Sequence, residues 1–386
     1  MDDVGAKIAA TRTARRMTQR QLAESAAVSL SLLRKVEQGT RPATDRTLEA
    51  LAVALGVPPD VLAGRRARTD SRVHSVIPAL RQAIDAYDLP DDGPVRALPD
   101  LRRVVQEMTV QRLSSRYTVI AETVPPVLAE LTRAVHTMPG PDAQQAAGLL
   151  TIAYRAADAV AYKYGYYDLS ARLVELMRWS AVQSAEPVLA ATAAYVRTEV
   201  FFASQNLRPG LRALEQAIEA MTPVTLAENA ALGALHMRAA VVAARLTEDL
   251  RVVDEHLAEA RRLAHAVPEG IYTGTAFGPA SLHVHEVSVA VELGDAARAV
   301  QAAGRQVPLN DLPAERRSHY WIEVARAQLW LGMRRQALRS LHEARHAAPQ
   351  HVREHPHVRD ALVTLLRLSV TPSRPLVAFA EWARAI

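Results

Sequence analysis

Small and apolar residues recur at helical spacing through residues 18–39, with polar residues between them. The positions that can face one another across this stretch are Leu22, Ala23, Val28, Leu33 and Val36. Their spacing predicts two short helices that are joined by a sharp turn and packed at a steep angle. Ser29 precedes the second helix, where its hydroxyl can accept a hydrogen bond from a free backbone N–H. The stretch therefore predicts a helix-turn-helix unit.

The second predicted helix presents a short-chained and basic outer face, made of Leu30, Ser31, Arg34 and Lys35. The major groove of DNA accepts a helix with such a face. Arg34 is expected either to bond a guanine edge or to touch a phosphate, and Leu30 either to meet a thymine methyl group or to pack on a dimer partner. The predicted DNA-binding residues are Thr18, Gln19, Ser29, Leu30, Ser31, Arg34, Lys35, Thr40 and Arg41.

Two of these residues have further expected roles. Gln19 lies in the first turn of its helix, so its amide can contact a phosphate or brace the second helix. Arg41 follows the second helix and is expected, like Lys35, to contact the DNA backbone. Helices are also predicted over residues 3–16 and from residue 45 to Leu55, which makes a small domain of five helices over residues 1–64.

Residues 3–64 resemble the five-helix DNA-binding domain of the phage-repressor or xenobiotic-response-element type. The resemblance is carried by Thr18, Gln19, Leu22, Ala23, Val28, Ser29, Val36, Glu37, Gly39, Thr47, Leu48, Leu51, Ala52, Leu55, Gly56 and Val57. It implies that the helix from Ser29 reads the major groove and that Glu37 pairs with Arg12. Ala27 and Arg16 stand where many members have glycine, a difference that costs about 1 kcal/mol at a turn position.

The basic excess of the chain is confined to this end. Residues 1–72 contain 13 Lys or Arg and 8 Asp or Glu, a balance of +5, whereas the remaining residues contain 33 of each. A localised basic excess favours a polyanionic partner for that domain. Chance asymmetry on a solvated surface is the alternative.

Helical patterns separated by proline-rich breaks fill the chain from residue 101 to its end, and no strand is predicted there. Pro125-Pro126 and Pro139-Gly140-Pro141 are interpreted as turns. The clearest repeat covers residues 318–351, where the spacing of a tetratricopeptide repeat is matched by Trp321, Ala325, Gly332, Ala337, Leu341, Ala344 and Pro349. The predicted architecture is all-α, with a linker over 65–75 and a tetratricopeptide-like α-solenoid over 76–386.

Aromatic residues cluster in the predicted solenoid, and 5 of the 10 tyrosines lie between residues 154 and 167. Tyrosine rings suit a groove for a peptide or a small organic ligand, but they also fill cores between repeats. The candidate ligand-binding residues are Tyr154, Tyr162, Tyr166, Tyr195, Phe202, Asn206 and Asn229. The two asparagines can hold a peptide backbone by bidentate hydrogen bonds, but helix capping is the role favoured for single asparagines at helix ends, and Asn206 fits that role well.

No metal, cofactor or catalytic activity is expected. The chain has no Cys, which excludes thiolate sites. His351 and His355 would meet only if Arg353 were helical, and Pro356 argues against a helix there. We find no glycine-rich phosphate loop and no metalloprotease or hydrolase motif. No long apolar run is visible, so a cytoplasmic protein without a signal peptide or membrane span is predicted.

The predicted arrangement is similar to that of two-domain bacterial regulators, including Gram-positive quorum regulators that sense peptides, and actinomycete regulators of development. The resemblance implies a homodimeric transcription regulator of double-stranded DNA, with a peptide or small-molecule signal bound by the solenoid. An alternative is a protein-interaction module that sequesters a partner through the solenoid, with DNA binding auxiliary.

Overall fold

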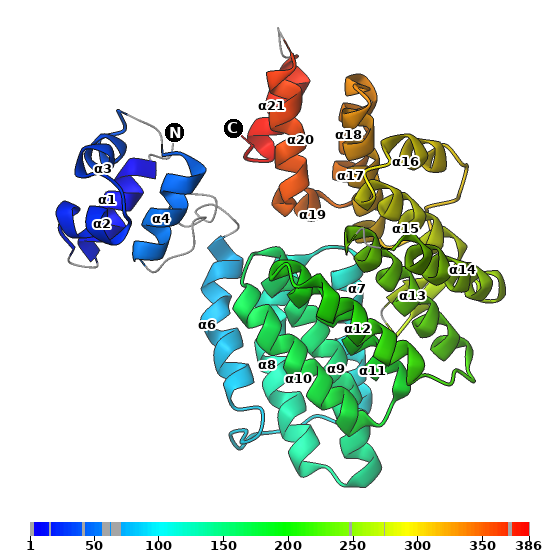
Figure 1. The fold of residues 1–386 in the computed structure, drawn as a ribbon. Helices are drawn as coiled ribbons and strands as arrows, with labels where there is room; N and C mark the ends of the chain where they lie inside the picture. The colour runs from blue at the N-terminus through cyan, green and yellow to red at the C-terminus, as the bar shows by residue number, and fades with distance from the viewer. Residues whose placement is uncertain are drawn as a thin grey trace. The chain divides into compact units, whose positions relative to one another are not determined.

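The computed structural model separates into two compact units, residues 1–74 and 75–386 (Figure 1). The residues that it describes are 4–14, 17–40, 43–55, 62, 71–246, 249–273, 275–369 and 373–385. Helices make up nearly all the regular structure in these ranges, which confirms the all-α prediction. Each unit has its own apolar core, so we describe each by itself.

The first unit contains the helices α1 (Val4–Ala14), α2 (Gln19–Ser25), α3 (Leu30–Glu37) and α4 (Asp45–Leu55). Each of the four helices contributes at least one side chain to the core, in which Ile8, Leu22, Leu33 and Leu51 are fully buried. Leu62 is buried in the same core, whereas the rest of the predicted fifth helix lies outside the described residues. The apolar pattern along the chain therefore corresponds to a single shared core.

The turn between α2 and α3 has the features that the sequence predicts. Thr18 caps α2 by accepting a hydrogen bond from the N–H of Gln21, whose side chain in turn accepts from the Thr18 N–H. Ser29 caps α3 by accepting from the Leu32 N–H at 3.1 Å. Ala27 has a φ of 49°, a left-handed conformation that glycine adopts more easily than alanine.

The second unit is a succession of helices, most of which pack on a neighbour along the chain. The helices that follow α4 are α6 (Ser71–Asp85), α7 (Leu98–Leu113), α8 (Tyr117–Thr137), α9 (Gly140–Lys163), α10 (Tyr167–Ser184), α11 (Pro187–Ala203), α12 (Leu207–Glu219), α13 (Leu226–Leu246), α14 (Leu250–Ala266), α15 (Pro279–Glu292), α16 (Ala296–Ala303), α17 (Ala314–Trp330), α18 (Arg334–Ala347), α19 (Pro349–Glu354), α20 (Pro356–Arg367) and α21 (Arg374–Trp382). Because successive helices pair, the chain builds a layered, solenoid-like stack, as predicted.

The helix pair predicted for residues 318–351 is present as α17 and α18. Gly332 joins them with a φ of 73°, a left-handed conformation suited to glycine. Ala325, Ala337 and Ala344 are fully buried, which lets the two helices approach closely. Pro349 begins α19 instead of simply ending α18.

Two predictions for this unit are wrong. Pro125 and Pro126 lie inside α8 and do not form a turn. Burial of Val124 and Leu128 on either side of them favours the continuous helix over the local preference of proline. Residues predicted to lack strands contain a short antiparallel hairpin of β1 (Gly270–Tyr272) and β2 (Thr275–Phe277).

Packing against α13 holds the hairpin in place more than its two three-residue strands do. Phe277 is fully buried against α13, where Gly233 has no side chain and a Cβ would overlap the Phe277 ring. Three-residue strands are too short for alternation of apolar and polar residues to be visible in the sequence. The hairpin was therefore not predictable from its own residues.

Candidate nucleic-acid interface and ligand site

The outer face of α3 carries the exposed side chains of Ser31, Arg34 and Lys35. Arg34 and Lys35 follow each other on the solvent side of the helix, opposite the buried Leu33 and Val36. Leu30 differs from expectation because it is half-buried and packs on the core of the first unit. The polar outer face of α3 therefore consists of one hydroxyl and two cations.

The buried end of α3 is fixed by the carboxylate of Glu37. The Arg12 guanidinium donates to Glu37 Oε1 from Nε at 2.7 Å and to Oε2 at 3.1 Å. Gln19 donates from its amide to the same Oε2 at 2.6 Å, and Arg12 also donates to the Met17 carbonyl at 2.9 Å. The hydrogen bond to Glu37 raises the pKa of Arg12. These contacts join α1, α2 and α3, and they confirm the implied pair of Arg12 and Glu37.

The remaining candidate residues surround this helix. Gln19 is half-buried and occupied by Glu37, so it braces α3, one of its two expected roles. Thr18 and Ser29 are exposed caps. Thr40 donates its hydroxyl to the Lys35 carbonyl at 3.0 Å and so closes the C-terminal end of α3. Arg41 lies outside the described residues.

In the second unit, a cluster of arginines surrounds Tyr195 of α11. Arg316 donates to the Tyr195 hydroxyl at 2.9 Å, and the Arg238 guanidinium lies 4.3 Å from the centroid of the ring. Arg155 donates to the Thr275 hydroxyl at 2.6 Å, and its guanidinium is 6.0 Å from the same ring. We call Arg155, Tyr195, Arg238 and Arg316 the arginine–tyrosine cluster.

The arginine–tyrosine cluster carries a positive potential. Burial lowers the pKa of Arg155 to about 9, and the charges of Arg112 and Arg316 lower it as well. Burial alone would raise the pKa of Tyr195, but the charges of Arg238, Arg316 and Arg155 outweigh it and lower that pKa. Such a site favours a carboxylate or another anion.

Two acidic residues, Glu199 and Asp158, lie near the cluster, and Glu199 Oε1 is 3.9 Å from Arg238 Nη2. Burial raises the pKa of Glu199, and it raises the pKa of Asp158 well above its ordinary value. Asp158 accepts a hydrogen bond from the Ser170 hydroxyl at 2.6 Å, which opposes the effect of burial only in part. Lys163 and Glu315 neutralise each other across 2.7 Å. The three arginines of the cluster therefore outnumber the two acids, Glu199 and Asp158.

The structure brings only some of the candidate ligand residues together. The Arg238 guanidinium lies over the rings of Tyr195 and Phe202. Burial raises the pKa of Tyr162, and the charge of Arg238 opposes that rise. Tyr154 is fully buried in the core. Tyr166 precedes α10 and is half-buried.

The two asparagines differ from each other. Asn206 is exposed at the N-cap position of α12, where a cap was expected, but its side chain makes no capping hydrogen bond. Asn229 donates its amide to the Thr225 carbonyl at 2.9 Å.

The sequence did not single out Arg238 or Arg245. Both lie on α13, an alanine-rich helix that is buried for most of its length, and both guanidiniums lie over the Phe202 ring. Two arginines seven residues apart in an otherwise apolar helix share one face. That spacing was the feature of the sequence from which the two arginines could have been identified.

Space beside Tyr195 is small in this structure. A cavity of about 10 Å³ is lined by Thr192, Tyr195, Tyr272 and Thr275 together with alanines of α11 and α13. That volume holds about one water molecule. Because Tyr272 and Thr275 belong to the hairpin, a larger ligand requires the hairpin to move.

A larger pocket of about 260 Å³ lies elsewhere in the second unit, on α7, α9 and α11. Its polar lining residues are Arg102, Gln106, Thr109, Gln145 and Glu186. None of the sequence-predicted ligand residues is among those that line it.

None of the described helices is both long and apolar enough to cross a membrane. Residues 3–64 match a family model described as a helix-turn-helix domain, and the first unit is therefore a helix-turn-helix DNA-binding domain. No curated protein matches the chain.

Several solved structures are similar at low identity. A crystal structure of Bacillus thuringiensis PlcR in complex with the peptide PapR7 and DNA is 15% identical, covers 69% of this chain and 95% of that chain, and has a TM-score of 0.29. A complex of PrgX with iCF10 is 10% identical, covers 99% and 95% of the two chains, and has a TM-score of 0.28. A mutant of PrgX is 9% identical, covers 98% and 99%, and also has a TM-score of 0.28. Scores this low carry no argument about the function of this chain.

Proposed function

We propose that the chain is a sequence-specific transcription regulator that reads the DNA major groove with α3. The observation that supports this most directly is the exposed face of Ser31, Arg34 and Lys35 on a helix fixed by two capped ends and the Glu37 contacts. Arg34 reads a base edge and Lys35 contacts phosphate. The N-terminus of α2 lies beside α3 and offers backbone N–H groups to a second phosphate.

Selection of genomic DNA fragments by the purified chain tests this proposal. Wild-type protein is expected to enrich a defined set of fragments that share one short sequence. The variant Arg34→Ala is expected to lose that shared sequence while retaining weak binding to many fragments. A wild-type selection without any enriched sequence would contradict the proposal.

We further propose that the second unit dimerises and places two copies of α3 on half-sites. In two-fold symmetric helix-turn-helix dimers, half-site centres lie about one DNA turn or a multiple of it apart. The enriched sequence is therefore expected to be an inverted repeat. Sedimentation of the free chain is expected to give twice the mass of the monomer, and a monomer bound to a non-repeated site would contradict dimerisation.

The second unit is proposed to sense a peptide or small organic molecule that carries a carboxylate. The supporting observation is that three arginines, one buried and two half-buried, surround Tyr195, whereas two acidic residues, Glu199 and Asp158, lie near them. Binding would displace Thr275 from Arg155 and move the hairpin. A ligand of this kind changes DNA binding only as far as it prefers one of two conformations.

Repeating the fragment selection with and without culture extract tests the sensing proposal. Extract is expected to change the affinity for the enriched sequence in the wild type and not in Arg238→Met, which keeps the long side chain without the charge. Arg339→Met, at an exposed arginine of α18, serves as the matched control. A response to extract that survives in Arg238→Met would place the ligand elsewhere.

A further inference from the structure

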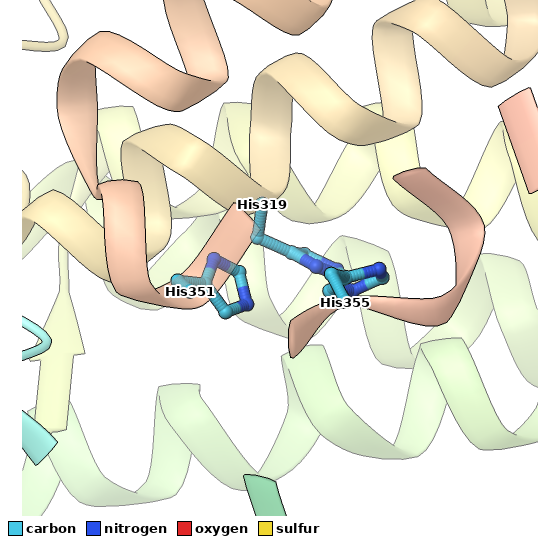
Figure 2. Close-up of side chains that lie close together, drawn as sticks. All are labelled: His319, His351 and His355. Carbon is cyan, nitrogen blue, oxygen red and sulfur yellow. The ribbon is translucent and has the colours of Figure 1, made fainter. Parts of the chain in front are cut away.

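Three histidine side chains from separate segments meet in the second unit (Figure 2). His319 lies on α17, His351 lies on α19, and His355 lies directly before α20. One ring nitrogen of each lies within 4.8 Å of the corresponding nitrogens of the other two. We propose that this group, the histidine cluster, binds a divalent transition-metal ion of the zinc type.

The donor set and its spacing fit such an ion. Three imidazole nitrogens with an open fourth position form one of the usual zinc ligand sets. In a tetrahedral site with Zn–N bonds of about 2.0–2.1 Å, ligand nitrogens are about 3.4 Å apart. The separations of up to 4.8 Å therefore need to shorten by at most about 1.4 Å.

Two of the ring nitrogens are buried without a hydrogen-bond partner. His351 Nδ1 is 3.0 Å from the Ser318 hydroxyl, which leaves His351 Nε2 free to be a ligand. Among the described residues, neither His351 Nε2 nor His355 Nδ1 has a hydrogen-bond partner. Buried polar atoms without partners are uncommon because their desolvation is not compensated. A metal ion would supply the missing partner to both.

The three rings are held in the form that binds metals. Burial lowers the pKa of all three, and the positive charge of Lys163 lowers it further for His351, to about 3. Neutral imidazole, and not imidazolium, coordinates a metal ion.

Two ion pairs lie beside the cluster. Lys163 is paired with Glu315 at 2.7 Å, and Arg316 and the ring of His357 also influence His319. Glu323 lies on the other side, with Oε1 3.9 Å from His319 Nε2 and 4.0 Å from His357 Nδ1. Glu323 is also paired with Arg326 at 2.7 Å, so each of the two carboxylates neutralises a cation beside the cluster. The His319 side chain is 42% exposed, which leaves a route of entry from solvent.

A bound ion would join three segments that otherwise contact one another through side-chain packing. His319 belongs to the helix pair α17–α18, whereas His351 lies within the short α19 and His355 joins α19 to α20. Metal binding would therefore fix α20 and α21 to α17. This inference is independent of the proposed function, because it concerns metal binding and not DNA binding.

Calorimetric titration of the full, untagged chain with Zn²⁺ after treatment with a chelator tests the inference. Wild-type protein is expected to bind one ion per chain. Loss of an outer-shell partner weakens metal affinity about 10–100-fold. Ser318→Ala removes such a partner from His351, so its affinity for Zn²⁺ is expected to fall by that factor. His319→Gln and His355→Gln remove ligands and are expected to weaken binding by at least about 100-fold.

His346→Gln is the matched control, because His346 is an exposed histidine on α18 outside the cluster. It is expected to bind Zn²⁺ as the wild type does. His319→Gln guards against a folding defect, since its partly exposed side chain leaves the helix packing intact and its melting curve without metal should match the wild type. Wild-type protein that binds no Zn²⁺, or His319→Gln and His355→Gln variants that bind it unchanged, would overturn the inference.

Discussion

Glu37 is the residue on which the geometry of the first unit most depends. Its carboxylate accepts from Arg12 and Gln19, which belong to α1 and α2, while its own backbone ends α3. The Glu37 side chain is only 5% exposed and that of Arg12 is 16% exposed, so water screens their interaction weakly. Contacts of this kind contribute more than the exposed ion pairs elsewhere in the chain.

Glu37→Gln is therefore expected to destabilise the first unit by about 1–3 kcal/mol, because it leaves the Arg12 charge partly buried without a partner. Hydrogen exchange of the α1 and α3 amides should accelerate accordingly. Glu259→Gln, which breaks an exposed pair with Arg262, should change stability by at most about 0.5 kcal/mol. Equal effects of the two substitutions would show that the Glu37 contacts do not hold the helices together.

Ala27 and its neighbour Ala26 differ in backbone conformation. Ala27 has a φ of 49°, whereas Ala26 has a φ of −89° and is buried. Ala27→Gly is expected to stabilise the first unit by about 0.5–1 kcal/mol because it relieves the left-handed conformation. Ala26→Gly is expected to destabilise it by about 1 kcal/mol. Chemical denaturation monitored at the first unit would show effects of opposite sign, and the same sign for both would refute the argument.

At the residue scale, local chemistry was largely predictable and distant contacts were not. Ser29, Ala27 and the pair of Arg12 and Glu37 followed from local spacing or from the resemblance of the domain. Leu30 was assigned to the outer face because helical spacing cannot show that an end residue folds back on the core. Arg316 approaches Tyr195 across a separation of 121 residues, which no local pattern records.

At the scale of elements, α3 shows why a short helix can be predicted well. Its two buried residues, its serine cap and its basic outer face are all contained in nine consecutive positions from Ser29 to Glu37. The histidines show the opposite case. Arg353 is helical because α19 ends at Glu354, one residue before His355 and two before Pro356, so proline did not prevent His351 and His355 from meeting. His319 reaches them from α17, which sequence spacing alone did not indicate.

The contact between α13 and α14 includes a pair of histidines whose protonation is linked to folding. His236 Nδ1 and His256 Nδ1 are 3.0 Å apart, and burial together with His256 lowers the pKa of His236 to about 4. A histidine with a folded-state pKa below its unfolded value of 6.5 opposes protonation in the folded state. Its stabilising effect is present above pH 6.5 and is lost as the pH falls toward 4.

Between neutral pH and pH 4, the wild type is therefore expected to lose about 2–3 kcal/mol more of its free energy of unfolding than His236→Gln loses. Urea unfolding at pH 7.5 and at pH 4, compared as a difference between variants, measures this effect. His346→Gln should follow the wild-type profile because His346 is exposed. A His236→Gln profile parallel to the wild type would contradict the linkage.

At the scale of the whole molecule, the chain joins a basic DNA-binding unit to a larger unit with no net formal charge. Residues 1–72 carry the whole excess of +5, and the outer face of α3 places two of those cations in the open. The second unit contains buried arginine around Tyr195 and a separate histidine cluster. This division agrees with the proposals that the first unit reads DNA and that the second binds a signal or a metal ion.

The most direct test of this assignment is fluorescence anisotropy on the fragment enriched by selection and on a scrambled fragment. Arg34→Ala is expected to lose about 1–3 kcal/mol on the enriched fragment and little on the scrambled one. Lys35→Ala is expected to weaken both equally and to reduce the salt dependence by about one phosphate contact. Arg339→Ala removes an exposed charge from α18 and should bind as the wild type does. Wild-type affinity for the enriched fragment in both the Arg34→Ala and Lys35→Ala variants would contradict DNA reading by α3.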